Sequence, residues 1–516
     1  MKSWRSPIQY KVDMDYPFVI KNRTTFGTNT MPTNESSNDI NEPEYEITFE
    51  PDFNTRYSVS GFRSLVDFEI ELTPGINVLV GPNGSGKTNF IEFQDFISDV
   101  TTFGCSKAVF SAGGISRVFS QETTKRSSSK LQATIRGIAD ISDSLDAEDT
   151  NHRFFRYEYH IEIRYSKKHS SIFVHKENLR IFKMHNADEW WPSYSPVGNI
   201  SVRRRSPADN GDSIWALGSR LFTQNYRNPF HVLSRFYSMR QSQSHKRHRD
   251  ILQSIRDRIE STPIMSDESF LSAIHSIPAL DAIRKSISRG HSFNAIPEKT
   301  READDLASRP GISFDGSGLS ATLYHLQQLK RQDHTLRRRP RGAINVVRAN
   351  KETLDMIVEW TKLVIPELVS ISVTPDPHSG KYQGYLTINE NEPIKFPLQS
   401  ASDGTLKWLA LCCLILTYNG VFSIEEPENF LHPKMQQSLI SLIRETIEDS
   451  SPTKHFTLST HSESLINQCK PNEIVTFKYT SKGTTCAKIK NPARVQEEIN
   501  RTGFGLGNYY ASNAIS

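Results

Sequence analysis

The segment with the clearest chemistry is Gly81-Pro-Asn-Gly-Ser-Gly-Lys87-Thr88, which matches the pattern GxxxxGK[ST]. Its glycines let backbone amides turn inward around phosphate groups without Cβ clashes. Lys87 is placed to neutralise phosphate charge, and the Thr88 hydroxyl to bind Mg²⁺. A helix that starts at Lys87 points its positive end at the same phosphates. The predicted nucleotide-binding residues are Asn83, Gly84, Ser85, Gly86, Lys87, Thr88 and Asn89.

A second candidate is the acidic segment Ile424-Glu425-Glu426-Pro427-Glu428, which follows an apolar strand. Adjacent carboxylates at the end of a strand are costly unless a cation or a reaction uses them. Glu425 is placed to hold Mg²⁺ through its water shell. Glu426 is placed to orient or deprotonate an attacking water. Together with the glycine-rich loop, this segment predicts hydrolysis of ATP with Mg²⁺.

Two further segments have both a functional and a structural interpretation. Ser402-Asp403-Gly404 precedes an apolar helix, where a hydroxyl and backbone amides form an anion site or simply an N-cap. His461 follows the strand Phe456–Thr460, a place where a lone histidine is commonly structural. The sequence alone leaves both alternatives open.

These segments need an α/β scaffold that brings them together. The apolar run Ile76–Val80 predicts a buried strand before the glycine-rich loop, and Lys87–Ile97 has helical spacing. Strands and helices alternate again after residue 315, which predicts a mainly parallel sheet. Phe154–Tyr165 and Ile172–Phe182 alternate like an antiparallel pair. The predicted divisions are an extended leader (1–43), an N-terminal lobe with the antiparallel strands (44–200), a helical insertion (201–314) and a C-terminal lobe (315–516).

Composition favours a globular protein without a membrane span. The chain has 516 residues and a net charge of +4, and its longest apolar run, Trp408–Leu416, is far shorter than the roughly 20 residues that a membrane helix needs. The N-terminal residues contain no apolar stretch that could serve as a secretory signal, so we expect a cytoplasmic location. The five cysteines show no metal-ligand spacing. Basic clusters at Arg203–Arg205, Lys246–Arg249 and Arg337–Arg341 are either solvated loops or contacts to double-stranded DNA.

The order of these motifs resembles the RecF/SMC/OLD branch of ABC-type ATPases, over roughly Tyr45–Ser98 and Asp315–Ile466. The segment Pro427–Pro433 is similar to an element of OLD-type and phage-defence ATPases such as those of Septu, PARIS and retron systems. Two departures exist: Glu425 stands where many ABC proteins have Asp, and the glutamine loop has only Gln121 as a candidate. The resemblance implies the following roles: signature for Ser402, Asp403 and Gly404; Walker B for Glu425 and Glu426; switch histidine for His461; nucleotide contacts for Arg63 and Ser64.

The resemblance also implies how the chain works. Family members place the signature of one subunit against the nucleotide of another, so we expect ATP-dependent dimers or larger homo-oligomers. OLD-type nucleases carry a C-terminal Toprim domain, and the segment after His461 is too short for a domain of about 100 residues. We therefore expect an ATPase that regulates a separate effector, a nuclease, in anti-phage defence. A RecF-like DNA-repair ATPase and a nucleotide-locked scaffold that sequesters an effector are the alternatives.

Overall fold

The computed structural model describes most of the chain after residue 52. The described residues are 53–120, 129–140, 154–183, 198–208, 212–217, 257, 259, 261–275, 277–288, 292–331, 351–418, 422–448 and 455–512. All of them fall within one compact unit, formed by Phe53–Met184 and Tyr194–Ser516. Within these ranges, no helix is both long and apolar enough to cross a membrane.

A six-stranded sheet carries the strand that precedes the glycine-rich loop. Its order is β16-β15-β3-β14-β13-β9, and all neighbours run parallel except β15 and β16. Strands β3 and β14 are buried along almost their whole length, as expected of central parallel strands. The predicted mainly parallel sheet is therefore present. Its strands are β3 (Gly75–Val80), β9 (Ser292–Phe293), β13 (Ser423–Glu425), β14 (His455–Thr460), β15 (Ile474–Thr480) and β16 (Gly483–Lys488).

A second, seven-stranded antiparallel sheet has the order β2-β1-β4-β5-β6-β7-β8. Two of its strands, β1 and β2, precede β3 in the chain, and the other five follow it. Buried and half-buried residues alternate along β1, β4 and β5, because one face of the sheet packs on the core. The predicted antiparallel pair is confirmed as β5 and β6. The strands are β1 (Thr55–Ser60), β2 (Phe68–Leu72), β4 (Lys130–Asp140), β5 (Phe154–Ser166), β6 (Ser171–Lys183), β7 (Gly198–Arg203) and β8 (Asp212–Leu217).

The range 201–314 differs from the predicted helical insertion. It holds the short helices α6 (Phe270–Ala273), α7 (Pro278–Ile287) and α8 (Pro297–Arg301), but β8 lies in the seven-stranded sheet and β9 in the six-stranded one. The proposed boundary at residue 200 also falls inside β7. Strands this short give little periodicity, and β9 exists only through its pairing with β13. Such strands depend on distant partners, so the local pattern does not reveal them.

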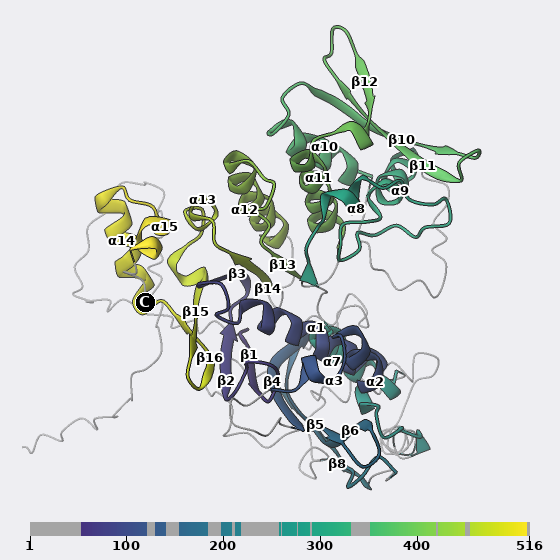
Figure 1. The fold of residues 1–516 in the computed structure, drawn as a ribbon, viewed down its shortest axis with the longest axis vertical. Helices are drawn as coiled ribbons and strands as arrows, with labels where there is room; N and C mark the ends of the chain where they lie inside the picture. The colour runs from purple at the N-terminus through teal and green to yellow at the C-terminus, as the bar shows by residue number, and fades with distance from the viewer. Residues whose placement is uncertain are drawn as a thin grey trace, which may run out of the picture. The chain divides into compact units, whose positions relative to one another are not determined.

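The described residues between 319 and 448 form four α-helices, a small sheet and one strand of the six-stranded sheet. The three-stranded antiparallel sheet β10-β11-β12 lies beside α9, α10 and α11 (Figure 1). These elements are α9 (Leu319–Arg331), α10 (Thr353–Lys362), β10 (Leu368–Asp376), β11 (Lys381–Ile388), β12 (Ile394–Pro397), α11 (Asp403–Thr417) and α12 (Pro433–Glu448). The remaining helices are α1 (Lys87–Phe103), α2 (Cys105–Ser111), α3 (Ile115–Val118), α13 (Glu463–Ile466), α14 (Pro492–Thr502) and α15 (Leu506–Ala511).

Helix α1 ties the glycine-rich loop to the hydrophobic core. The ring of Phe90 lies 5.6 Å from that of Tyr57, and the ring of Phe93 lies 5.5 Å from that of Phe62. Each buried aromatic side chain of this kind stabilises the fold by about 1.5–3 kcal/mol. Because these rings come from one face of α1, they fix the helix against the seven-stranded sheet. The start of α1, where the chemistry is expected, is thereby held in place.

Candidate ATP site

The glycine-rich loop connects β3 to α1 in the conformation that phosphate binding requires. Gly84 and Gly86 have left-handed φ angles of 76° and 103°, which other residues adopt only at a cost. Gly86 caps α1 without a side-chain hydrogen bond, so the first amides of the helix are available for an anion. The Ser85 hydroxyl is buried and has no hydrogen-bond partner among the described residues. These open donors fit a bound phosphate chain.

Lys87 lies at the centre of the polar contacts around this loop. Its Nζ donates to the carbonyl oxygens of Gly81 (2.8 Å) and Pro82 (3.2 Å), and it lies 2.9 Å from His461 Nε2. Burial lowers the pKa of the Lys87 ammonium, while the carboxylates of Glu426 and Glu428 oppose that shift. The positive charge is thus held where the loop would meet the terminal phosphates.

Thr88 and Glu425 offer two oxygen atoms for a cation. Thr88 Oγ1 donates to Glu425 Oε2 over 3.0 Å, and burial is the main reason that the pKa of Glu425 is raised. Mg²⁺ prefers oxygen ligands and is commonly bound through one or two protein groups together with waters and substrate phosphates. A half-buried carboxylate next to a hydroxyl matches that preference. Thr88 and Glu425 therefore fit the predicted metal position.

Glu426 has an unusual backbone conformation. Its φ is +42°, a left-handed value that costs a residue with a Cβ about 1–2 kcal/mol. Two hydrogen bonds stabilise this conformation. The Glu426 amide donates to the Ser459 carbonyl (2.9 Å), and Asn429 Nδ2 donates to Glu426 Oε2 (2.9 Å). Strain of this kind is concentrated at functional sites. The two neighbouring carboxylates therefore have different hydrogen-bond partners, Thr88 for Glu425 and Asn429 for Glu426.

His461 lies at the end of β14, next to the loop. Burial and the nearby Lys87 ammonium lower the pKa of His461 below its usual value. The imidazole is therefore neutral at pH 7, and a neutral Nε2 accepts a hydrogen bond from Lys87. Because β3, β13 and β14 are parallel neighbours, their carboxyl ends bring the loop, Glu425 and His461 to one edge of the sheet.

Glu428 is a site residue that the sequence-based reasoning did not single out. Its Oε1 accepts hydrogen bonds from Thr460 Oγ1 (2.7 Å) and from the His461 amide (2.8 Å). The carboxylate thereby joins the turn after β13 to the end of β14. The motif Glu-Pro-Glu contained the signal, since a second carboxylate two residues after Glu426 also needs a partner once it is partly buried.

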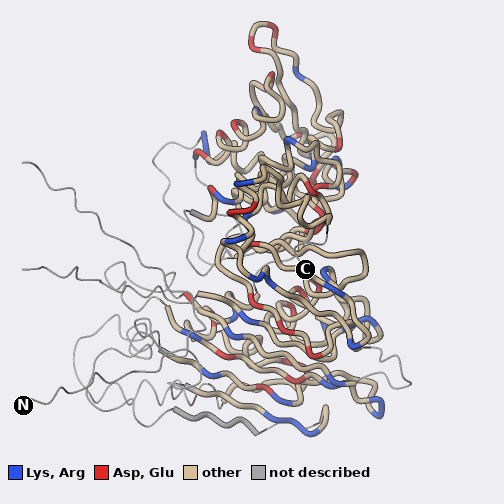
Figure 2. The backbone as a smooth tube through the Cα atoms, turned by 90° about the vertical axis from the view of Figure 1, so that its left-hand side faces the viewer, with Lys and Arg blue, Asp and Glu red and all other residues tan. Residues whose placement is uncertain are grey.

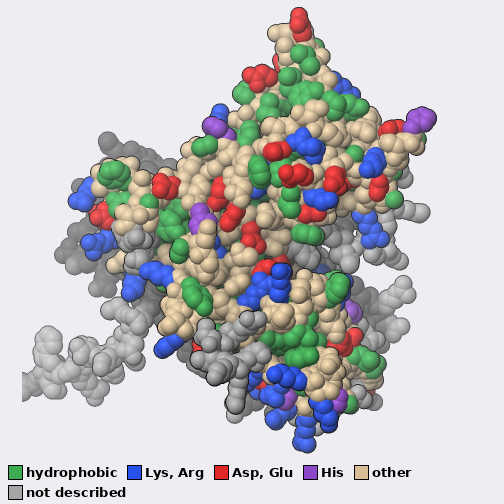
Figure 3. Space-filling view, in the orientation of Figure 1, with side chains coloured by type: hydrophobic (Ala, Val, Ile, Leu, Met, Phe, Trp, Pro, Cys, Tyr) green, Lys and Arg blue, Asp and Glu red, His purple; other side chains and the backbone are tan. Residues whose placement is uncertain are grey.

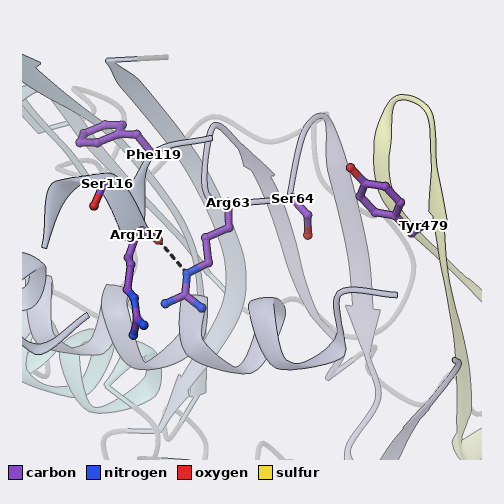
Figure 4. A pocket seen from close by; sticks show the side chains of 6 residues that line it. All are labelled: Arg63, Ser64, Ser116, Arg117, Phe119 and Tyr479. Carbon is purple, nitrogen blue, oxygen red and sulfur yellow. Dashed lines mark hydrogen bonds between the residues drawn. The ribbon is translucent and has the colours of Figure 1, made fainter. Parts of the chain in front are cut away.

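Arg63 and Ser64 lie beside the start of α1, where both contact Asn89, and their contact with a nucleotide stays a prediction. Ser64 Oγ accepts from Asn89 Nδ2 (2.6 Å) and lies 2.7 Å from Thr484 Oγ1. Arg63 Nε donates to the Arg117 carbonyl (2.7 Å). The two side chains line an open pocket of about 390 Å³ (Figure 4). Its lining residues are Arg63, Ser64, Ser116, Arg117, Phe119 and Tyr479.

The predicted signature segment is located elsewhere. Ser402 caps α11, and its Oγ accepts from the Thr405 amide (3.2 Å), while Asp403 pairs with Arg301. Gly404 lies so close to the Phe430 carbonyl that a Cβ would approach it to 2.7 Å. Among the described residues, no hydrogen bond or ion pair joins this segment to the glycine-rich loop. Its N-cap role is therefore observed, and an anion-binding role stays a prediction.

The predicted basic clusters are only partly visible. The clusters Lys246–Arg249 and Arg337–Arg341 lie outside the described residues. The same is true of Gln121, the candidate for the glutamine loop. In the cluster Arg203–Arg205, the middle arginine is fully buried and donates to the Val174 carbonyl (3.3 Å), so it does not line a DNA surface. Basic and acidic residues both occur along the strands of the seven-stranded sheet (Figure 2), and side chains of both signs lie on the face in Figure 3. A mixed surface of this kind is not by itself a nucleic-acid site.

A comparison with protein families decides the class of the site. The family model AAA_21, described as "AAA domain, putative AbiEii toxin, Type IV TA system", matches residues 76–467, from β3 beyond His461. The chain belongs to this family. The AAA_21 match covers every element that contributes to the geometry described above except the stretch before β3 and the strands after α13. The chain therefore contains an AAA-family ATPase domain.

Curated relatives and solved structures add weaker similarities. Proteins named "DNA replication and repair protein RecF" are 42% identical over 45 residues in Nocardioides sp. and 43% over 44 residues in Streptomyces avermitilis. These stretches cover 9% and 8% of this AAA_21 chain, and 11% and 12% of the relatives, so the chain spans about a tenth of their length.

Two solved SMC heads align along most of the AAA_21 chain with low scores. A SmcHead bound to the C-winged helix domain of ScpA has a TM-score of 0.41 at 13% identity, covering 86% of this chain and 98% of that one. The SMC head domain from Thermotoga maritima has a TM-score of 0.34 at 11% identity, covering 84% and 98%.

The contact between Gly86 and Thr484 leads to a stability prediction. Gly86→Ala should destabilise the protein more than Gly75→Ala, although both glycines have left-handed φ angles. A Cβ at Gly86 would lie 2.1 Å from the buried Thr484 hydroxyl, whereas no atom lies within 4 Å of a Cβ at Gly75. Overpacking costs about 1–3 kcal/mol. The measurement is the urea midpoint of both variants, and equal midpoints would contradict the close packing of the loop.

Proposed function

We propose that this chain binds and hydrolyses ATP at the loop 81–88. The observation that carries the proposal is the convergence of Lys87, Glu425, Glu426 and His461 at one edge of the parallel sheet. Lys87 and the loop amides bind the β- and γ-phosphates, and Arg63 and Ser64 contact the nucleotide beside α1. Mg²⁺, held by Thr88 and Glu425, supplies positive charge against the phosphate oxygens when bound.

Glu426 acts as the base in this proposal. Its carboxylate takes a proton from the attacking water as the water oxygen bonds to the γ-phosphorus and the bond to the β–γ bridging oxygen breaks. The neutral His461 stands beside Lys87, where it senses the γ-phosphate. The hydrogen bonds of Glu426 with Asn429 and Ser459, where Glu425 instead accepts from Thr88, support a role distinct from that of Glu425.

We further propose that two copies pair around ATP. Ser402, Asp403 and Gly404 are not joined to the loop of their own chain, which supports their use by a second copy. In such a dimer each nucleotide lies between the loop of one subunit and the signature of the other. Larger homo-oligomers are built from the same contact.

Mixing two inactive variants tests this arrangement. Glu426→Gln and Ser402→Arg should each hydrolyse ATP slowly, but their mixture should hydrolyse it much faster than the sum of the two. In the mixed dimer, one composite site combines the intact Glu426 of one subunit with the intact Ser402 of the other. The measurement is phosphate release as a function of the mixing ratio. A mixture that only averages the two rates would contradict a shared site.

The cellular role that we propose is regulation of a partner effector, a nuclease, in prokaryotic anti-phage defence, with a cytoplasmic location. It is supported by the Pro427–Pro433 element and by a family description that names a toxin–antitoxin system. The short RecF matches favour a second candidate, a DNA-repair ATPase. Stimulation of hydrolysis by double-stranded DNA that weakens steeply with salt would support that candidate. Slow hydrolysis unaffected by DNA would favour a nucleotide-locked scaffold.

A further inference from the structure

Lys407 is a charged residue in an otherwise apolar helix. It lies on α11, five residues after Ser402, and only 1% of its surface is exposed. Its neighbours Leu406 and Trp408 are fully buried core residues. Burying an ammonium costs several kcal/mol unless other groups compensate it. A leucine or methionine would fill the same buried position without the free-energy cost of desolvating an ammonium group. The contacts of Lys407 show which groups offset that cost.

The Lys407 ammonium faces the turn that carries the proposed base. Its Nζ donates to the Glu426 carbonyl oxygen over 3.2 Å and lies 5.9 Å from the centre of the Phe430 ring. Burial lowers the pKa of Lys407 to about 8, while the carboxylates of Glu428 and Glu426 favour its charged form. Glu428 Oε2 is buried and has no hydrogen-bond partner among the described residues. The turn thus presents negative charge to the lysine.

The opposite side of the same turn leads to the nucleotide site. Glu428 Oε1 binds the amide of His461, and the His461 ring contacts Lys87. The left-handed Glu426 is the residue whose carbonyl Lys407 holds. These hydrogen bonds, together with the backbone of the turn Glu426–Glu428 and the His461 residue itself, connect the helix that starts at the predicted signature with the lysine of the glycine-rich loop.

We propose that Lys407 is a positioning residue that couples the signature helix to the base Glu426. When a second copy engages Ser402 at the start of α11, a shift of the helix moves the Glu426–Glu428 turn through Lys407. The carboxylate of Glu426 is then aligned only in the paired state. This inference rests on the proposed ATPase function and adds a residue that does not touch the nucleotide.

Lys407→Met and Lys407→Arg test the coupling. Lys407→Met removes the donor at similar volume, so kcat should fall about 100-fold, the effect of a misplacement of about 1 Å. The Kd for ATP should stay within about threefold, because the loop 81–88 is untouched. Lys407→Arg keeps a donor and should recover most of kcat. The matched control is Lys362→Met, a substitution of a half-buried lysine on α10 that pairs with Glu359 and should leave kcat unchanged.

The pH dependence of kcat separates positioning from simple packing. In the wild type, kcat should fall above a pH of about 8 as Lys407 loses its proton in front of Glu426, Glu428 and the Phe430 ring. In Lys407→Arg the guanidinium stays charged, so this fall should move to higher pH. Lys87 and His461 are the same in both proteins, so their titration cannot produce the difference.

Each outcome decides the inference. A folded Lys407→Met protein with kcat within twofold of wild type would overturn it, as would an identical alkaline fall in wild type and Lys407→Arg. If Lys407→Met does not fold, as judged by its thermal transition, the pH comparison with Lys407→Arg alone supports or overturns the coupling. An inactive wild type would instead contradict the proposed function, so the two failures are distinguishable.

Discussion

Replacing Glu426 by Gln should slow ATP hydrolysis by about 10²–10⁴-fold, the usual contribution of a general base. The amide has nearly the same shape and can still accept from Asn429, so the turn should keep its conformation. It cannot take a proton from water, however. ATP should therefore bind normally and accumulate in the paired state, which gel filtration with light scattering would detect as an ATP-dependent dimer.

A matched control is available for this variant. Glu390 is exposed and lies in the turn between β11 and β12, so Glu390→Gln makes the same chemical change outside the site. It should hydrolyse ATP at the wild-type rate. Hydrolysis by Glu426→Gln within twofold of wild type would contradict the assignment of Glu426 as the base.

Removal of the Lys87 ammonium should weaken ATP binding strongly and not only slow the chemical step. A hydrogen bond to a charged group contributes about 1.5–3 kcal/mol, so losing one to the phosphates weakens ATP binding by about 10–150-fold. Lys87→Ala also leaves the Gly81 and Pro82 carbonyls without the donor that holds the loop. Equilibrium titration with ATP measures the effect.

The control for Lys87→Ala is Lys482→Ala, at an exposed turn between β15 and β16. This variant should bind ATP as tightly as the wild type. Tight ATP binding by Lys87→Ala itself would show that the loop 81–88 does not hold the phosphates in the proposed way.

Much of the site could be predicted because its motifs are local. The glycines of the loop, the buried strand before it and the helix after it are adjacent in sequence, so their pattern determines their geometry. The alternation of strands and helices predicts parallel neighbours, and parallel neighbours bring their carboxyl ends together. The proximity of Thr88 to Glu425 and of Lys87 to His461 follows from that rule.

The remaining features depend on contacts between distant residues. Ser64 meets Thr484 across 420 positions, and no local pattern pairs them. The cluster Arg203–Arg205 predicts an exposed basic segment, but Arg204 is fully buried and donates to the Val174 carbonyl of β6. The sequence does not predict a role for Lys407, because its partner, the Glu426 carbonyl, is positioned only by the strained turn after β13.

The most direct test of the central claim is the release of phosphate from ATP by the purified chain, with Mg²⁺ and double-stranded DNA present. We expect steady release by the wild type that stops when Mg²⁺ is chelated and is almost absent in Glu426→Gln and Lys87→Ala. Equal rates for the wild type and both variants would contradict the account, since the activity would then not come from the loop 81–88 and Glu426.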